Sequence, residues 1–458
     1  MAITNVSSTR TTAQSSSTGV SNRAAMSLVT TLFFVWGFVT CLNDILIPHL
    51  KAIFDLNYAQ VMLVQFVFFS GYFVFAVPSG MLVEWIGYKR TMVGGLLTMA
   101  IGALLFLPAA NIPAFPFFLA ALIVLAAGIT ALQVSANPYV SILGPPETAS
   151  SRLNLTQAFN SLGTTVAPYF GSLLILSAAP LAIAQVRQLS PPALQAYRLH
   201  EAASVKFPYL LIAVALIVLA VIIGFFKLPV ISSAEDPTLP AVAANRSKLL
   251  NAVLTVSVIG VIGMTVIKFR KQRPLLLGAL GIFLYVGAEV SIGSFLVNYF
   301  SQPNIGAMSE KTAAVYVSFY WGFAMLGRFI GSAVLQKVRA GALLGLVAVV
   351  ACGLTVASML SFGHIAMWTI ILVGLFNSVM FPSIFTLGIA GLGALTGEGS
   401  GLLVAAIVGG AIIPVAEGAL ADRIGIHHAF ILPALCYLYI AFYGFKGSRQ
   451  LVTGGTQS

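Results

Sequence analysis

The chain has 458 residues, of which 59% are hydrophobic, and only 35 carry a formal charge (23 Lys or Arg and 12 Asp or Glu). A water-soluble globular domain cannot bury that much apolar surface, so the composition excludes this class. The net charge of +11 does not indicate a nucleic-acid partner, because the basic residues fall in short loops and one linker rather than on an Arg-rich face.

Residues 1–25 are rich in Ser and Thr and lack an apolar core, which is typical of a disordered cytoplasmic tail rather than of a signal peptide. Beyond them, apolar runs of about 20 residues recur, and this is the length that crosses a bilayer. They predict an all-α membrane protein with six spans, a polar linker and six more spans. The expected spans are 26–48, 58–83, 89–110, 115–141, 152–177, 208–227, 274–299, 312–334, 341–361, 365–390, 400–420 and 428–446.

The expected domains follow from this order. A first six-helix bundle occupies 26–227, a cytoplasmic linker 228–273, a second bundle 274–446 and a cytoplasmic tail 447–458. Residues 249–267 of the linker are apolar enough to span, but basic residues flank them on both sides, so we expect a non-spanning segment. The Lys and Arg of the loops then gather on the side of the termini, which predicts that both termini are cytoplasmic.

The first span contains an acid, Asp44, deep in its apolar run. A carboxylate at bilayer depth is costly, so it usually faces a hydrated cavity and has a function there. Asp44 shares a helical face with Gly37, Thr40 and Cys41, and this small, polar face suits a cavity wall. Cation-coupled transport is therefore the first hypothesis, and a structural acid bonded to a neighbouring helix is the alternative.

The second span ends in a loop with Gly80, Glu84, Gly87, Lys89 and Arg90. Its glycines allow two helices to approach, and its acid and bases are expected to pair at the membrane face and latch one conformation. The pattern resembles the cytoplasmic signature loop of the major facilitator superfamily, although Glu84 stands where that superfamily more often has Asp. Simple anchoring by positive charge is the alternative.

Two further basic residues are assigned to the same conformational role. The eighth span ends with Gly327-Arg328-Phe-Ile-Gly331, which echoes the loop after the second span, and Arg152 opens the fifth span. This echo predicts that the two halves of the chain are related to each other.

Amide side chains form a pattern in the fourth and fifth spans. Gln133 and Asn137 lie four residues apart on one helical face, and Gln157 and Asn160 share a face of the next span. Each amide offers both donors and acceptors, so a group of them suits the recognition of hydroxyl groups. Hydrogen bonding between helices is the alternative for any single residue.

A second acid, Glu289, falls about as far into the seventh span as Asp44 does into the first. If an axis along the membrane normal relates the halves, both carboxylates face one central cavity. Glu417 is a third buried acid, but its closeness to Asp422 and Arg423 indicates a structural ion pair. The residues predicted to bind the substrate are Asn43, Gln133, Asn137, Gln157, Asn160, Asn298, Trp321, Asn377 and Phe381.

Several of these segments resemble the fucose–galactose–glucose:proton symporter family of the major facilitator superfamily, and in particular its bacterial glucose/galactose branch. The resemblance rests on Leu42-Asn-Asp-Ile-Leu-Ile-Pro48, the run from Leu132 to Asn160, Gly287-Ala-Glu-Val-Ser-Ile-Gly-Ser-Phe-Leu-Val-Asn-Tyr299 and Pro382-Ser-Ile-Phe-Thr-Leu-Gly388. It implies a twelve-helix fold in two six-helix bundles related by a pseudo-two-fold axis, with a central sugar site.

The resemblance also carries over roles residue by residue. An Asp and a Glu serve proton coupling and sugar binding in the fucose branch. The Asp matches Asp44, but the position of the Glu holds Gln133. Gln157 and Asn160 match amides that line the fucose site, and Phe381 replaces a Tyr. Because Glu289 stands where the fucose branch is neutral, we infer that the second titratable acid has moved across the cavity.

Together these features predict a monomeric, multi-pass transporter of the bacterial inner membrane that imports a hexose by alternating access. Asp44 and Glu289 are the predicted coupling residues, with H⁺ as the coupling ion and Na⁺ as the alternative. Fucose, mannose or N-acetylglucosamine are alternative substrates to glucose and galactose. No cofactor, metal site or catalytic residue is predicted, and an intramembrane enzyme or a channel is the rival class.

Overall fold

The computed structural model describes residues 22–54, 58–112, 115–174, 188–203, 205–229 and 258–449. All the regular elements in these ranges are helices. Ten of the spans they form are long and apolar enough to cross a membrane. Two further long helices, α5 (Ala149–Leu174) and α12 (Glu310–Val334), occupy the predicted fifth and eighth spans. The described ranges therefore contain the six-plus-six order that the apolar runs predict.

The first half is built from long helices joined by short connections. Its spans are α1 (Asn22–Phe54), α2 (Tyr58–Ile86), α3 (Tyr88–Asn111), α4 (Phe115–Ile142), α5 and α8 (Lys206–Phe225). A shorter helix, α7 (Pro191–Ala203), precedes α8. Helix α1 packs on α5, while α3 packs on α4 and α8.

In the second half, three of the spans are broken into shorter helices. Its elements are α11 (Arg273–Phe300), α12, α13 (Ala340–Leu360), α14 (Gly363–Asn377) with α15 (Met380–Ile389), α16 (Thr396–Ala405) with α17 (Gly409–Ile424), and α18 (Ile426–Ala429) with α19 (Ile431–Phe442). Helix α11 packs on α15, α17 and α19, and α13 packs on α14 and α19.

The prolines explain one break and one unusual contact. Pro382 follows the break between α14 and α15, because a proline ring clashes with the carbonyl group four residues earlier, here that of Ser378. Pro138 likewise has no N–H to offer the carbonyl oxygen of Val134. That oxygen instead accepts a hydrogen bond from the Ser400 hydroxyl of the other half at 3.1 Å.

Between the halves, the structure describes residues 228–229 and 258–273 of the linker, and the second of these stretches contains α10 (Val258–Lys268). This helix is about 16 Å long, far short of the roughly 30 Å hydrocarbon layer. It contacts α2 and α16. Residues 230–257 lie outside the described residues, so a non-spanning segment over 249–267 stays a prediction.

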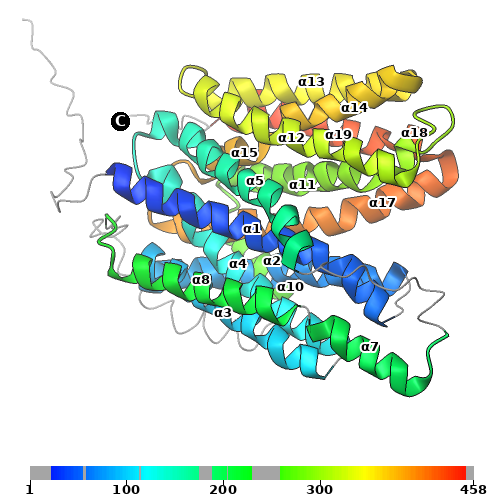
Figure 1. Cartoon of the computed structure of the whole chain (residues 1–458). Helices are drawn as coiled ribbons and strands as arrows, with labels where there is room; N and C mark the ends of the chain where they lie inside the picture. The colour runs from blue at the N-terminus through cyan, green and yellow to red at the C-terminus, as the bar shows by residue number, and fades with distance from the viewer. Residues whose placement is uncertain are drawn as a thin grey trace, which may run out of the picture.

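The two halves meet mainly along two helix pairs, α5 with α12 and α2 with α16, and in smaller contacts of α4 with α16 and of α5 with α15. In Figure 1, α3 and α8 lie in the lower part of the view and α13 and α14 in the upper part, with α5 and α12 between them. Helices α2 and α12 are the second spans of their halves, and α5 and α16 belong to the fifth. Exchanging the halves therefore exchanges the two contacts, as a pseudo-two-fold axis along the bundle requires.

Two close approaches show how tight the second pair is. A Cβ atom added to Gly80 of α2 would lie 2.6 Å from the carbonyl oxygen of Gly397, and one added to Gly401 would lie 2.7 Å from that of Ala76. Both contacts lie near the end of the bundle that carries Lys89, Arg90, Lys337 and Arg339, called the basic end below. The halves are thus in backbone contact at the basic end.

Candidate functional site

Three of the predicted amide residues are buried between α2, α4 and α5 of the first half. The Gln133 Nε2 group donates a hydrogen bond to the hydroxyl of Tyr72 at 2.9 Å. The Gln157 Nε2 group donates to Asn137 Oδ1 at 3.4 Å. The Asn137 Nδ2 group is buried without a partner. Because an unpaired buried donor is costly, this group suits an added hydroxyl acceptor.

The fourth predicted amide, Asn160, holds two helices together. Its Nδ2 group donates to the carbonyl oxygen of Phe33 on α1 at 2.9 Å. Gly37 permits the approach, since a Cβ atom there would lie 2.1 Å from the carbonyl oxygen of Asn160. Trp36 lies on the same stretch of α1, is 6% exposed and packs against Phe33 with ring centroids 5.2 Å apart. Asn160 thus makes a contact between helices, and its part in sugar binding stays a prediction.

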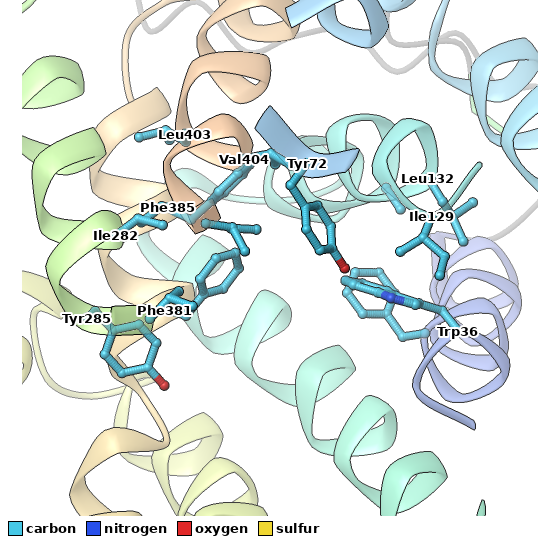
Figure 2. Packing of buried hydrophobic residues seen from close by; sticks show 14 of the residues in the cluster. Trp36, Tyr72, Ile129, Leu132, Ile282, Tyr285, Phe381, Phe385, Leu403 and Val404 are labelled. Atoms are coloured by element: carbon cyan, nitrogen blue, oxygen red, sulfur yellow. The ribbon is translucent and has the colours of Figure 1, made fainter. Parts of the chain in front are cut away.

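Aromatic and aliphatic side chains of the two halves lie on either side of Tyr72 in Figure 2. Trp36, Ile129 and Leu132 are on one side, and Tyr285, Phe381 and Phe385 are on the other. Phe381 is buried and stacks on Phe385, with ring centroids 5.9 Å apart. Phe381 therefore belongs to the aromatic cluster of the second half.

Tyr285 on α11, Tyr320 on α12 and Tyr437 on α19 are fully buried in the second half. Asn377 at the end of α14 donates its Nδ2 group to the Tyr320 hydroxyl at 2.9 Å. The hydroxyl of Tyr285 lies beside the carboxyl group of Glu289, and that of Tyr437 lies beside the side chain of Asn377. The polar atoms of this cluster therefore face one another, and their hydrogen-bonding capacity is not fully used.

Glu289 lies beside the tyrosines and interacts electrostatically with all three. Its Oε1 atom is buried and has no hydrogen-bond partner. The residue as a whole is partly exposed. Glu289 is thus an acid surrounded by phenols, and one of its carboxyl oxygens has no hydrogen-bond partner.

Trp321 and Asn298 are the remaining predicted residues of the second half, and only Trp321 lies near Glu289. Trp321 is 44% exposed, and its indole lies against Gly293, where a Cβ atom would be 3.0 Å from Cζ2. Gly293 shares the face of Glu289 one turn further along α11. Asn298 is exposed and lies about two and a half turns beyond Glu289, on the opposite face. The structure therefore does not bring Asn298 to the site.

Arg328 connects the halves near the predicted amides. Its Nη1 group donates to the carbonyl oxygen of Gln157 at 3.3 Å and to the Ser161 hydroxyl. Its own carbonyl oxygen accepts from Asn154 Nδ2 at 2.6 Å. Arg328 is also the basic residue that acts electrostatically on Glu289. It is thus a point where α5, α12 and the acid of α11 come together.

Glu84 occupies the second contact between the halves. Its Oε1 atom accepts a hydrogen bond from the backbone N–H of Glu398 at 3.1 Å. Lys268 of α10 forms an ion pair with the carboxylate of Glu398 and acts electrostatically on Glu84. Among the described residues, the cation beside Glu84 therefore comes from the linker, whereas Lys89 and Arg90 were the expected partners.

The other residues of the predicted conformational loops have simpler places. Gly87 has a φ of 82° at the start of α3, a conformation that suits glycine. Lys89 is partly exposed and Arg90 is exposed. Arg152 donates to the carbonyl oxygens of Val140, Ser141 and Pro145 at 3.1, 2.6 and 2.9 Å. Arg152 therefore caps the end of α4 and holds the loop before α5.

Two predicted residues cannot be placed in the site. Asn43 and Asp44 are in α1, but their side chains lie outside the described part of the structure, so their roles stay predictions. In the described ranges, no three His, Cys, Asp or Glu side chains are positioned to hold a metal ion.

Sequence reasoning missed several participants. Tyr72, Lys268 and Glu398 make contacts that no local pattern marks, since their partners are 61, 130 and 314 residues away. Glu417 was expected in an ion pair, yet it is fully buried and lies beside Ser291 of α11. The Gly-Glu-Gly sequence at Gly397–Gly399 was the available signal for the contact with Gly80 and Glu84.

Comparisons with known proteins agree with the fold. The model of the Major Facilitator Superfamily matches residues 28–407. A protein of Brucella abortus named glucose/galactose transporter is 52% identical over 426 residues, which are 93% of this chain and 94% of that protein. The L-fucose-proton symporter of Escherichia coli is 34% identical, and the match covers 91% of each chain.

A solved structure is also similar over almost the whole chain. It is the crystal structure of a major facilitator transporter, FucP, in the outward conformation, with a TM-score of 0.82 and 32% sequence identity. The similarity covers 94% of this chain and 100% of that chain.

Proposed function

This chain belongs to the Major Facilitator Superfamily and has its fold of twelve helices in two related halves, and from that premise we propose that it imports a hexose together with a proton. It is a multi-pass membrane protein, and its named relatives are transporters rather than enzymes. Glucose and galactose are the proposed substrates, and the bacterial inner membrane is the proposed location. Both follow from the 52% identity to the glucose/galactose transporter of Brucella abortus.

The observation that carries this proposal is the environment of Glu289. An acid with a buried, unpaired oxygen lies in the second half, and buried amides with spare hydrogen-bonding capacity lie in the first. The amides and tyrosine hydroxyls offer the donors and acceptors that a polyol needs. The acid supplies a group whose charge can change during a transport cycle.

Asp44 is proposed as the second coupling acid. It falls within the first-span motif that this chain shares with the proton symporter family. In alternating access, protonation of the acids neutralises the site and allows the halves to move with sugar bound. Sugar and proton then leave together on the other side.

The orientation of the molecule is part of the proposal. Lys89, Arg90, Lys337 and Arg339 gather at the basic end, so this end faces the cytoplasm by the positive-inside rule. The backbone contacts of Gly80 and Gly401 close that end. The structure then corresponds to the outward-facing state, and the similarity to FucP in its outward conformation supports this assignment. The proposed transporter acts as a monomer, because its pathway lies between the halves of one chain.

The test is sugar uptake into proteoliposomes that contain the purified protein. An inward proton gradient should drive uphill accumulation of glucose or galactose, and Asp44→Asn should abolish it, because the amide cannot exchange a proton. Exchange between saturated sugar pools should survive in this variant. Wild-type accumulation by Asp44→Asn would refute the coupling role.

The choice of ion and sugar is decided in the same vesicles. A sodium gradient without a proton gradient should give no accumulation, and accumulation under that condition would favour the sodium alternative. Counterflow with glucose, galactose, mannose, fucose and N-acetylglucosamine should rank glucose and galactose first. Absence of counterflow with all five sugars would overturn the proposed substrate class.

A further inference from the structure

Arg328 joins the two halves of the molecule both through its side chain and through its backbone. Its guanidinium group reaches from α12 to Gln157 and Ser161 on α5. Its backbone carbonyl oxygen accepts from Asn154 on the same helix at 2.6 Å. The Nε atom of Arg328 is buried and has no hydrogen-bond partner. The side chain therefore has donor capacity beyond what α5 uses.

The helix directions bring Arg328 and Glu289 toward one depth. The Arg328 backbone lies about 9 Å from the basic end of α12, and the Glu289 backbone lies about 24 Å from the basic end of α11. Side chains on a helix lean toward its N-terminus. Helix α12 ends at the basic end and α11 begins there. Arg328 thus extends away from that end while Glu289 leans toward it, which shortens the separation of about 15 Å between their backbones along the helix axes.

The other groups that face Glu289 cannot replace Arg328. Tyr285 of its own helix, Tyr320 of α12 and Tyr437 of α19 interact with it electrostatically, and all three are phenols. Arg328 is the cation among the described residues that acts on Glu289. Its guanidinium group therefore has an acidic neighbour, Glu289, as well as the oxygens of α5 to which it donates.

We propose that Arg328 prevents proton leak by holding α5 whenever Glu289 is protonated and no sugar is bound. This inference rests on the proposed function. When Glu289 is charged, it draws Arg328 away from Gln157 and Ser161 and so loosens the α5·α12 contact. When Glu289 is neutral, Arg328 returns to α5 and keeps the basic end closed, which is the arrangement in this structure.

The two positions of the Arg328 side chain, on α5 and toward Glu289, couple the movement of protons to the movement of sugar. The empty, deprotonated carrier can reorient, because its α5·α12 contact is loosened. The protonated carrier without sugar cannot, so protons do not cross alone. A sugar that binds at Gln157 lies beside the α5 oxygens that hold Arg328. The sugar displaces the guanidinium group from these oxygens, so the loaded carrier can reorient. Arg328 is therefore a positioning residue, because it acts through α5 and Glu289.

The experiment measures proton entry into proteoliposomes with a trapped pH-sensitive dye, with and without external galactose. Wild type should admit protons only when galactose is present. Arg328→Gln should admit protons severalfold faster without sugar, and its sugar accumulation ratio should fall toward one while sugar exchange continues. Arg328→Lys should restore part of the coupling, because it keeps the charge. Lys337→Gln, which removes an exposed cation at the basic end, is the matched control and should behave as wild type.

The outcomes separate this inference from the proposed function. If wild type shows no galactose-dependent proton entry, the proposed function fails. If wild type is coupled and Arg328→Gln keeps both its full accumulation ratio and its resistance to proton entry, the inference fails alone. If Arg328→Gln does not exchange sugar at all, proton entry without sugar is measured in Ser161→Ala in its place. Sugar-independent proton entry in Ser161→Ala supports the inference, and wild-type tightness overturns it.

Discussion

The two contacts between the halves, α5·α12 and α2·α16, are equivalent by the pseudo-symmetry of the fold but differ in what holds them. The α5·α12 contact uses polar side chains, with Asn154 bonded to the backbone of Arg328 and Ser151 donating to the carbonyl oxygen of Ser332 at 2.7 Å. The α2·α16 contact is built on glycines, with Gly80 against Gly397 and Gly401 against Ala76, and the backbone N–H of Glu398 donates to Glu84 beside them.

This difference separates two tasks that one interface has to perform. Glycine contacts depend on shape alone and lose their complementarity if any atom is added. Polar contacts can exchange partners at little cost, provided that each group finds a new one. The α5·α12 contact contains Arg328 and lies beside Gln157, so it is suited to sensing the site. The α2·α16 contact is suited to closing the basic end.

The largest effect is expected from adding a single carbon to the glycine contact. Gly80→Ala would place a Cβ atom 2.6 Å from the carbonyl oxygen of Gly397, which forces the halves apart. Overpacking of this kind costs about 1–3 kcal/mol, so the transport rate should fall about tenfold or more. Gly94→Ala is the control, since nothing lies within 4 Å of an added Cβ there. A transport rate equal to that of Gly94→Ala would show that the backbones do not need this closeness.

A smaller effect is expected from Asn154→Ala at the polar contact. The variant loses the hydrogen bond to the carbonyl oxygen of Arg328, which is worth about 1 kcal/mol, so the transport rate should change about fivefold. The melting temperature of the purified protein should fall only slightly. If Asn154→Ala slows transport more than Gly80→Ala does, the polar contact is the main closure and the comparison is reversed.

The smallest effect is expected from the linker. Lys268→Gln removes the ion pair with Glu398, but the Lys268 side chain is 41% exposed, so solvent screens the interaction. Exposed pairs contribute about 0–1 kcal/mol, which predicts a change of about two- to threefold in transport rate that shrinks at high salt. Lys271→Gln, an exposed cation three residues further, is the control. An effect that persists in high salt would indicate that α10 holds α2·α16 by more than charge.

The twelve-helix fold could be predicted from the chain because its signals are local. Apolar runs of bilayer length mark the spans, and Pro382 marks the break between α14 and α15. Glu289 could be singled out because an acid in such a run is rare. Gln133, Asn137 and Gln157 followed from their helical spacing, and the structure joins Asn137 to Gln157 directly.

The tertiary structure decided the partners of these residues. Glu84 bonds the backbone of Glu398, Asn160 bonds the backbone of Phe33, and Asn298 faces away from Glu289. Helical periodicity says which residues share a face, but not which neighbour that face meets. Contacts such as Asn154 with Arg328 join residues 174 positions apart and exist only once two separately formed bundles dock. The sequence by itself therefore determined the helices, the family resemblance and the candidate groups, because hydropathy and periodicity act within one span, whereas the docking of the halves decided which of those groups meet.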